Sequence, residues 1–396
     1  MNHEQAFFFQ VLQDYLHGSV TAKPQEAELS KVFTWAEKHK LSAIFFIQCE
    51  HFLKPDTSGF QRLHRSFGAA VAQYVARQQA GAKFRTAMDA ASLPYLPIKG
   101  TWVGEAYPHP QLRTMGDLDI LVHAEDSERI RDVLSPLGFQ NIKWAETEWD
   151  YRLNNTLFEL QAELFHTGEL HNRELEAFLN DPWSWAEPTA SGEYRLDQSF
   201  HFLYLIAHIA KHLRWVGVGY RQFYDLAVLM QRSRESYDWN WIREQAERLD
   251  FLRFVEICLA LNERWFGVPS PYPDDALNDE LFKTITAKIL SDGVFGFENK
   301  DNYLQSIAAG QTDADGAGKS RWQHLRTFLF PPYRDLITSQ KYAWLRGKPL
   351  LLPAAWVLRA VRGRNKQSRR QAAASYLKGS DAEIAARIVI LKELGL

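Results

Sequence analysis

The hydrophobic period of this chain changes twice, and the two changes separate regions that must fold differently. Up to residue 92, apolar residues recur every three or four positions, as Phe60, Leu63 and Phe67 do, which is typical of helices packed on one side. Residues 93–182 contain short β-like runs between turn residues, and the helical period returns after Pro182. The sequence therefore predicts an α+β protein: a small mixed sheet between an N-terminal helical region and a C-terminal helical domain.

The same patterns predict the order of regions along the chain. They are an N-terminal helical region (1–92), an α/β core (93–182), a helical domain (183–307), a flexible Gly/Ala/Asp-rich loop (308–320) and a C-terminal helical segment with a basic tail (321–396). The β-like runs of the core are Tyr95–Ile98, Asp119–Val122, Phe139–Trp144 and Leu157–His166. A helix should begin at Ser127 and end at Gly138.

Composition excludes several classes of protein. With 46% hydrophobic and 24% charged residues, the 396-residue chain is expected to be globular, and a net charge of -2 argues against a protein that mainly coats nucleic acid. Its two cysteines, Cys49 and Cys258, exclude a disulfide scaffold and are expected to be buried thiols. Neither a signal peptide nor a membrane-spanning stretch is predicted, so a cytoplasmic location is expected.

An Asp-x-Asp pair at the start of a β-like run carries most of the chemical information. Side chains of a strand alternate between its two sides, so Asp117 and Asp119 should point the same way. Two neighbouring carboxylates repel each other unless a hard divalent cation lies between them, and Mg²⁺ prefers a few carboxylates together with substrate phosphate oxygens. The pair therefore indicates phosphoryl or nucleotidyl transfer.

Basic residues and a glycine precede this pair. Lys99 and Gly100 follow an apolar run directly, where a glycine lets backbone N–H groups approach a phosphate and a lysine supplies a point charge. Arg113 lies four residues before Asp117 and could meet a triphosphate or a carboxylate through its planar guanidinium. Lys-Gly, Arg and Asp-x-Asp in this order indicate a phosphate site more specifically than the Asp-x-Asp pair alone.

These motifs resemble the DNA polymerase beta-like nucleotidyltransferase superfamily, and more closely an uncharacterised bacterial branch of it. The branch carries Lys-Gly, an aromatic-Pro segment, an Arg and a Gly-Asp-apolar-Asp-apolar-Leu-Val strand. The corresponding residues here are Lys99-Gly100, Tyr107-Pro108, Arg113 and Gly116 to Val122, and weaker similarity extends over most of Pro94 to Arg364. Lys99-Gly100 stands where the superfamily usually has Gly-Gly or Gly-Ser.

The resemblance implies a transfer of a nucleoside monophosphate from a nucleoside triphosphate (NTP), dependent on Mg²⁺ or Mn²⁺, with release of pyrophosphate. It places Lys99, Gly100 and Gly116 at the triphosphate. Asp117 and Asp119 would be metal ligands, joined by a third carboxylate from a later strand that could also serve as base. Glu163 fits this third position best, and Glu159, which has the same strand parity, is the alternative.

A helical segment downstream adds candidates for nucleotide or acceptor binding. His208 and His212 share one helix face and could hold zinc, contact the nucleotide or form structural hydrogen bonds. Lys211 either contacts phosphate or lies on a solvated surface. Arg221 and Asp225, four residues apart, most simply form a helix ion pair, unless Arg221 faces phosphate.

Two other kinds of function stay open at this point. The fold could be a catalytically inactive module that binds a nucleotide or a partner. It could also attach a nucleotide to a protein or an RNA, as in toxin-antitoxin or peptide-modification systems, and the basic run Arg359–Arg370 is the feature that favours this. The sequence contains no Gly-x-Gly-x-x-Gly, Walker or Gly-x-Ser-x-Gly motif, so it does not indicate dinucleotide-binding, P-loop or serine-hydrolase function. The acceptor and the preferred nucleobase are not predicted.

Overall fold

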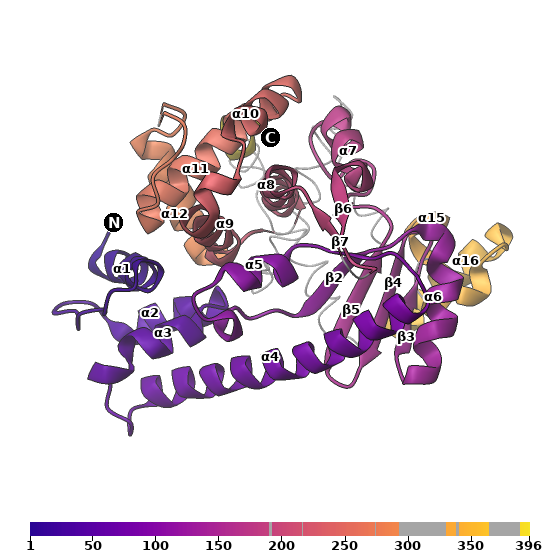
Figure 1. The fold of residues 1–396 in the computed structure, drawn as a ribbon, viewed down its shortest axis with the longest axis horizontal. Helices are drawn as coiled ribbons and strands as arrows, with labels where there is room; N and C mark the ends of the chain where they lie inside the picture. The colour runs from indigo at the N-terminus through magenta and orange to yellow at the C-terminus, as the bar shows by residue number, and fades with distance from the viewer. Residues whose placement is uncertain (190–191, 216, 274, 293–329, 338–339, 364–388) are drawn as a thin grey trace.

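A long helix joins the N-terminal helices to the sheet in the computed structural model, which describes residues 1–189, 192–215, 217–273, 275–292, 330–337, 340–363 and 389–396. The N-terminal elements are α1 (His3–His17), α2 (Leu29–Lys38), α3 (Ser42–Cys49), η1 (Glu50–Phe52) and α4 (Ser58–Ala90). Helix α4 begins where the Thr57 side chain accepts a hydrogen bond from the Phe60 amide, 3.3 Å away. Its 33 residues reach about 50 Å, so α4 contacts both α3 and the sheet (Figure 1).

The core is a five-stranded mixed sheet with strand order β1-β2-β5-β4-β3. The strands are β1 (Leu96–Pro97), β2 (Asp117–Leu121), β3 (Gln140–Trp144), β4 (Glu148–Leu153) and β5 (Thr156–Gln161). Strands β2 and β5 are parallel, and the other neighbouring strands are antiparallel. The helical elements among them are α5 (Gly100–Ala106), η2 (Pro110–Leu112), η3 (Ala124–Asp126), α6 (Ser127–Leu134) and η4 (Ser135–Leu137). Gly138, with φ of 87°, ends the last of these, as expected.

The two faces of the sheet have opposite character. Alternate residues such as Leu118, Ile120 and Phe158 form a hydrophobic core with the buried side chains of α4 and α6. The residues between them on β2, β4 and β5 present carboxylates to the other face. This alternation gives the sheet one mainly apolar face and one face that carries carboxylates.

Two details of the predicted sheet are wrong. Strand β4 was not predicted, although Trp149, Tyr151 and Leu153 alternate with polar residues and are buried in the core. The strand expected from Leu157 to His166 ends at Gln161. Beyond it, the Asn180 side chain accepts hydrogen bonds from the amides of residues 164 and 165, both at 2.9 Å, and so takes the place of a neighbouring strand.

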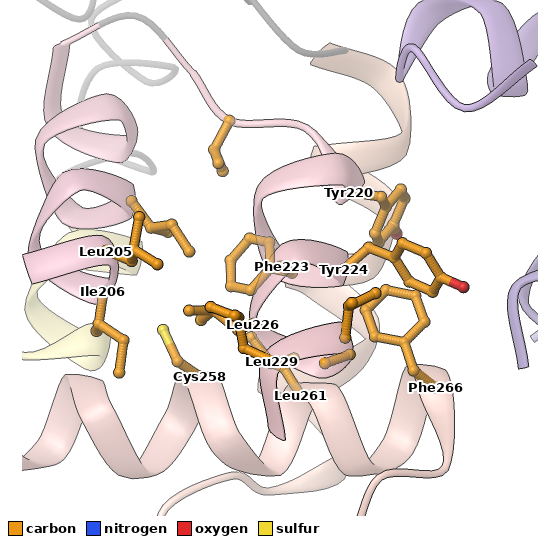
Figure 2. Close-up of a cluster of buried hydrophobic side chains, with 14 of the residues drawn as sticks. Leu205, Ile206, Tyr220, Phe223, Tyr224, Leu226, Leu229, Cys258, Leu261 and Phe266 are labelled. Atoms are coloured by element: carbon orange, nitrogen blue, oxygen red, sulfur yellow. The ribbon is translucent and has the colours of Figure 1, made fainter. Parts of the chain in front are cut away.

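The remaining elements form a mostly helical region beside the sheet (Figure 1). They are α7 (Arg173–Leu179), η5 (Pro182–Trp185), β6 (Ala186–Pro188), β7 (Tyr194–Leu196), α8 (Gln198–Trp215), α9 (Tyr220–Ser233), η6 (Arg234–Ser236), α10 (Trp239–Arg248), α11 (Leu252–Phe266) and α12 (Asp279–Asp292). Residues of α8 and α9 line a cavity together with the carboxylates of the sheet. Figure 2 shows side chains of α8, α9 and α11 meeting in a cluster that includes Leu205, Phe223, Leu226 and Cys258. This packing holds α8 and α9 in place beside the sheet.

The C-terminal part adds a small cluster of its own. It contains α15 (Tyr333–Ile337), η7 (Gln340–Leu345), η8 (Pro349–Leu351) and α16 (Leu352–Gly363), with Tyr342 and Leu345 buried among them. Leu391 and Leu394, near the chain end, are buried in the main core. The predicted loop 308–320 and residues 364–370 of the basic tail lie outside the described residues.

Two sequence-based expectations can be compared with the described residues directly. Cys49 and Cys258 are both free and buried, as predicted. None of the helices in the described parts of the chain combines the length and the apolar character that crossing a bilayer requires.

Candidate functional site

A cavity of about 450 Å³, here called the front pocket, lies between the acidic face of the sheet and helices α8 and α9. Every candidate residue predicted from the sequence lines it: Lys99, Gly100, Arg113, Gly116, Asp117, Asp119, Glu163, His208, Lys211, His212 and Arg221. These residues come from distant parts of the chain, so only the fold brings them together.

Carboxylates of three neighbouring strands form one wall of the front pocket. Asp117 and Asp119 project from β2, and the parallel register places Glu159 of β5 directly opposite Asp119. Strand β4 adds Glu148 to this wall and holds Asp150 next to it; the two residues pair in register with Gln161 and Glu159, respectively. Carboxylate oxygens of Glu148, Asp150 and Glu159 lie within 4.8 Å of one another, which is close enough to share a metal ion.

Burial and mutual repulsion make this wall costly to ionise. Desolvation, followed by the charge of Asp119, raises the pKa of Glu159 to about 8. The same two causes raise the pKa of Asp117. Desolvation also raises the pKa of Asp150 to about 6. Burial would raise the pKa of Glu148 too, but the hydrogen bond and charge of Lys143, together with Glu159 and His166, outweigh burial and lower it. A cation on this wall would relieve both the desolvation and the repulsion.

The structure separates the two candidates for the third carboxylate. Glu159 is in register with Asp119 and partly buried, because β5 holds it inside the sheet. Glu163 follows the end of β5; its side chain is 45% exposed and lies 3.8 Å from the His166 ring. Glu163 therefore belongs to the rim of the front pocket, whereas Glu159 belongs to the carboxylate wall.

Lys99 lies against this wall in an unusual backbone conformation. Its φ of 48° is in the region that side-chain-bearing residues rarely adopt. The conformation turns the chain from β1 into α5 and places Lys99 Nζ 2.7 Å from Asp119 Oδ1. Burial alone would lower the pKa of Lys99, but the charge and hydrogen bond of Asp119, together with Tyr204 and Glu159, outweigh burial and raise it.

The glycines beside Lys99 and Asp117 differ in what they leave room for. A Cβ atom at Gly100 would lie only 2.7 Å from both Arg113 Nη1 and Met115 Cε. A Cβ atom at Gly116 would meet no atom within 4 Å. Gly100 is therefore required by the packing of Arg113, whereas Gly116 borders open space where a ligand can approach the backbone.

Gly100→Ala should destabilise the protein by about 1–3 kcal/mol, because the added methyl group overlaps a guanidinium that cannot move freely. Urea unfolding measures this change. Gly68→Ala is the matched control: it lies inside α4 with nothing within 4 Å, and should stabilise the helix by roughly 0.5–1 kcal/mol. Equal stability changes for the two variants would contradict the steric requirement at Gly100.

Arg113 belongs to a buried network instead of extending freely into the front pocket. Its Nε and Nη2 atoms lie 2.8 Å from Oδ1 and Oδ2 of Asp225, and its Nη1 donates to the Gly100 carbonyl at 3.2 Å. The Tyr107 hydroxyl also donates to Asp225 Oδ1, at 2.7 Å. The helix ion pair predicted between Arg221 and Asp225 is therefore wrong, because tertiary contacts give Asp225 a bidentate partner from another element.

Basic and imidazole groups of α8 and α9 form the opposite wall. Arg221 donates to the Thr114 carbonyl at 2.8 Å, and among the described residues no carboxylate forms an ion pair with it. Burial, and then the charge of Arg113, lowers its pKa. Lys211 Nζ lies 2.7 Å from a Glu169 oxygen. An anion at this wall would neutralise the Arg221 guanidinium.

His208 and His212 face each other in this wall. Their Nε2 atoms are 2.9 Å apart, so one ring donates a hydrogen bond and the other accepts it. Burial is the main cause that lowers the pKa of His212 to about 3 and that of His208 well below its usual value. Of the described side chains, only Glu148, Asp150 and Glu159 form a group of three potential metal ligands, and it does not include these histidines. The neutral pair is suited to hydrogen bonding.

Sequence reasoning missed the contribution of β4 to the site. Glu148 and Asp150 have the same i, i+2 spacing as Asp117 and Asp119, and that spacing was the signal that could have found them. Glu169, which neutralises Lys211, carried no recognisable local signal. Its role depends on how the segment after β5 folds back toward α8.

Acidic strands opposite a basic helical wall form the kind of site that binds a polyphosphate together with a hard cation. The profile of a family described as uncharacterised nucleotidyltransferases matches residues 25–267, which is more than half of the chain. The chain belongs to this nucleotidyltransferase family. Every residue that lines the front pocket lies inside the matched range, whereas the weaker similarity expected from residue 268 to Arg364 lies outside it. Neither the curated proteins nor the solved structures compared with the chain contain a match.

Proposed function

We propose that this protein transfers a nucleoside monophosphate from an NTP to an acceptor, with release of pyrophosphate, and that the reaction depends on Mg²⁺ or Mn²⁺. One observation carries the proposal: a carboxylate wall and a basic wall face each other across a pocket of about 450 Å³. This volume lies within the usual range of small-molecule sites. Membership of a nucleotidyltransferase family supports the same activity.

The carboxylate wall fits a hard divalent cation. Its donors are carboxylate oxygens, the ligands that Mg²⁺ and Mn²⁺ prefer, and the raised pKa values of Asp117 and Glu159 reflect charge that a cation would neutralise. Asp117, Asp119 and Glu159 would turn toward the metal from one face of β2 and β5. Of the described carboxylates, those already close enough to share an ion are Glu148, Asp150 and Glu159. When bound, the ion would polarise the phosphates and offset charge on the leaving pyrophosphate.

Other groups of the pocket would bind and orient the substrate. Lys99, already beside Asp119, would form an ion pair with a triphosphate oxygen. Arg221 would donate hydrogen bonds to the phosphates from the opposite wall, and the neutral His208–His212 pair would contribute the one N–H group that its mutual hydrogen bond leaves free. Arg113 is held by Asp225 and donates a hydrogen bond to the Gly100 carbonyl. It would therefore affect substrate binding by fixing the position of Gly100. Placing the acceptor in line with the reacting phosphate would then supply much of the rate enhancement.

Calorimetric titration of ATP, GTP, CTP and UTP, with and without Mg²⁺, tests the proposed site. Wild-type protein should bind at least one NTP more tightly with Mg²⁺, and Glu159→Gln should lose at least about tenfold in that affinity, equivalent to about 1.4 kcal/mol. Glu163→Gln is the matched control and should stay within about threefold, because its side chain is at the rim. A larger loss for Glu163→Gln than for Glu159→Gln would restore Glu163 as the third carboxylate.

The same titration separates the alternatives. Asp117→Asn/Asp119→Asn should lose the Mg²⁺-dependent part of binding, and wild-type protein that binds no NTP would contradict the proposal. Acceptors are then sought with an α-labelled NTP in small-molecule and macromolecular fractions of a cell extract. Label in the macromolecular fraction would favour a protein or RNA acceptor. Binding without label transfer to either fraction would favour a catalytically inactive binding module.

A further inference from the structure

A second cavity, here called the rear pocket, lies on the opposite face of the sheet from the carboxylates. Its volume is about 410 Å³, and α4, α5 and β7 enclose it against Leu118 and Ile120. Met115 lines both pockets, and the strands lie between them. A molecule in the rear pocket therefore occupies a site separate from that of the proposed nucleotide.

Two arginines of α4 flank a glycine on the wall of this pocket. Arg77, Gly81 and Arg85 are spaced by four residues, so they lie on one face of the helix and all line the cavity. A Cβ atom at Gly81 would lie 3.4 Å from Arg85 Nη1, which shows that the Arg85 guanidinium folds back over the glycine. Without a side chain at Gly81, a ligand can approach both guanidinium groups.

Neither guanidinium has an ion pair with a carboxylate among the described residues. Arg77 is only 8% exposed, and its hydrogen bond is to the Met115 carbonyl at 3.0 Å. Burial, and then the charge of Arg113, lowers its pKa. A buried charge without an ion pair is costly. Asp117 acts on Arg77 from the other side of the sheet, and Glu105 and Glu193 also line the cavity, but an anion placed between Arg77 and Arg85 would gain a direct ion pair with each guanidinium.

Aromatic rings border the rest of the rear pocket. Trp102 and Tyr74 come from α5 and α4, and Phe84 and Phe158 form part of the apolar base. The Arg195 guanidinium lies over the Trp102 ring at 5.2 Å from its centroid, so stacking of a planar cation on this ring is already present. Flat walls of this kind favour a planar ring in the ligand.

We propose that the rear pocket binds a small organic anion with a planar aromatic or heteroaromatic ring, its carboxylate or phosphate between Arg77 and Arg85 and its ring beside Trp102. Two sources share this chemistry, nucleoside monophosphates and aromatic carboxylic acids. The proposal does not depend on the reaction assigned to the front pocket, because the two sites use different residues apart from Met115.

Saturation-transfer NMR on the full chain tests this proposal with two arms. One uses AMP, GMP, CMP and UMP beside their nucleosides; the other uses benzoate and indole-3-acetate beside the corresponding amides. At least one anion should bind, and its neutral counterpart should bind at least about tenfold more weakly, since the charged hydrogen bonds are lost. The arm that contains this anion identifies its source. No binding in either arm, or equal binding of the neutral counterpart, would overturn the proposal.

Variants then locate the binding. Arg85→Gln should weaken it at least tenfold, and Gly81→Leu should abolish it by filling the pocket while improving helix propensity, so folding is retained. Lys83→Gln removes a charge from the exposed side of α4 and should change affinity less than twofold. Asp117→Asn/Asp119→Asn should likewise retain binding. Affinity that survives both Arg85→Gln and Gly81→Leu, or that is lost only in the front-pocket variant, would overturn the proposal.

Discussion

Asp119→Asn should reduce Mg²⁺-dependent nucleotide transfer by on the order of 10³-fold or more. The expected loss corresponds to several kcal/mol of charge stabilisation at the metal. Asn is a better replacement than Ala here, because its Oδ1 can still accept a hydrogen bond from Lys99 Nζ, which lies 2.7 Å from the native carboxylate. The fold should therefore survive. Label transfer from the NTP that binds most tightly measures the effect.

A carboxylate outside the pocket provides the control for this prediction. Asp126 is also a buried aspartate, and its Oδ1 pairs with Arg129 Nη1 at 2.8 Å. Asp126→Asn should keep transfer within about threefold of the wild-type rate. If Asp119→Asn kept more than a tenth of wild-type transfer, Asp119 would not be a metal ligand of the reaction.

Asp225→Ala should destabilise the protein by about 3–5 kcal/mol. The Arg113 and Asp225 side chains are only 7% and 9% exposed, so removal of the carboxylate leaves a buried guanidinium without a counter-charge. Tyr107 loses its hydrogen-bond acceptor in the same variant. Urea unfolding at neutral pH measures the change, provided that the slope against urea concentration stays constant.

An exposed ion pair supplies the comparison for Asp225. Arg264 Nη1 and Asp279 Oδ1 are 2.9 Å apart, but the Asp279 side chain is 86% exposed, so Asp279→Ala should cost less than about 1 kcal/mol. Arg113→Met/Asp225→Leu should recover part of the stability that Asp225→Ala loses, because no unpaired charge remains. A cost below 1 kcal/mol for Asp225→Ala would show that water reaches Arg113.

Local sequence patterns were sufficient to predict much of this fold. The period of two predicted that Asp117 and Asp119 share a face, and that face lines the front pocket. Gly138 ends the helical segment that begins at Ser127, because a left-handed conformation suits glycine. Strand β4 escaped prediction because it contains as many polar as apolar residues over a short length. Such a strand is recognised by its alternation and not by its hydrophobicity.

The sequence by itself determined the class of the fold, the acidic pair and the glycine at which α5 begins, because these depend on neighbours within a few residues. The tertiary structure alone decided which later carboxylate stands beside Asp119, since that follows from the register of β5 on β2. The tertiary structure also pairs Asp225 with Arg113 and places Arg77 at the wall of the rear pocket. Partner choice between distant segments depends on burial and geometry that only the packed chain creates.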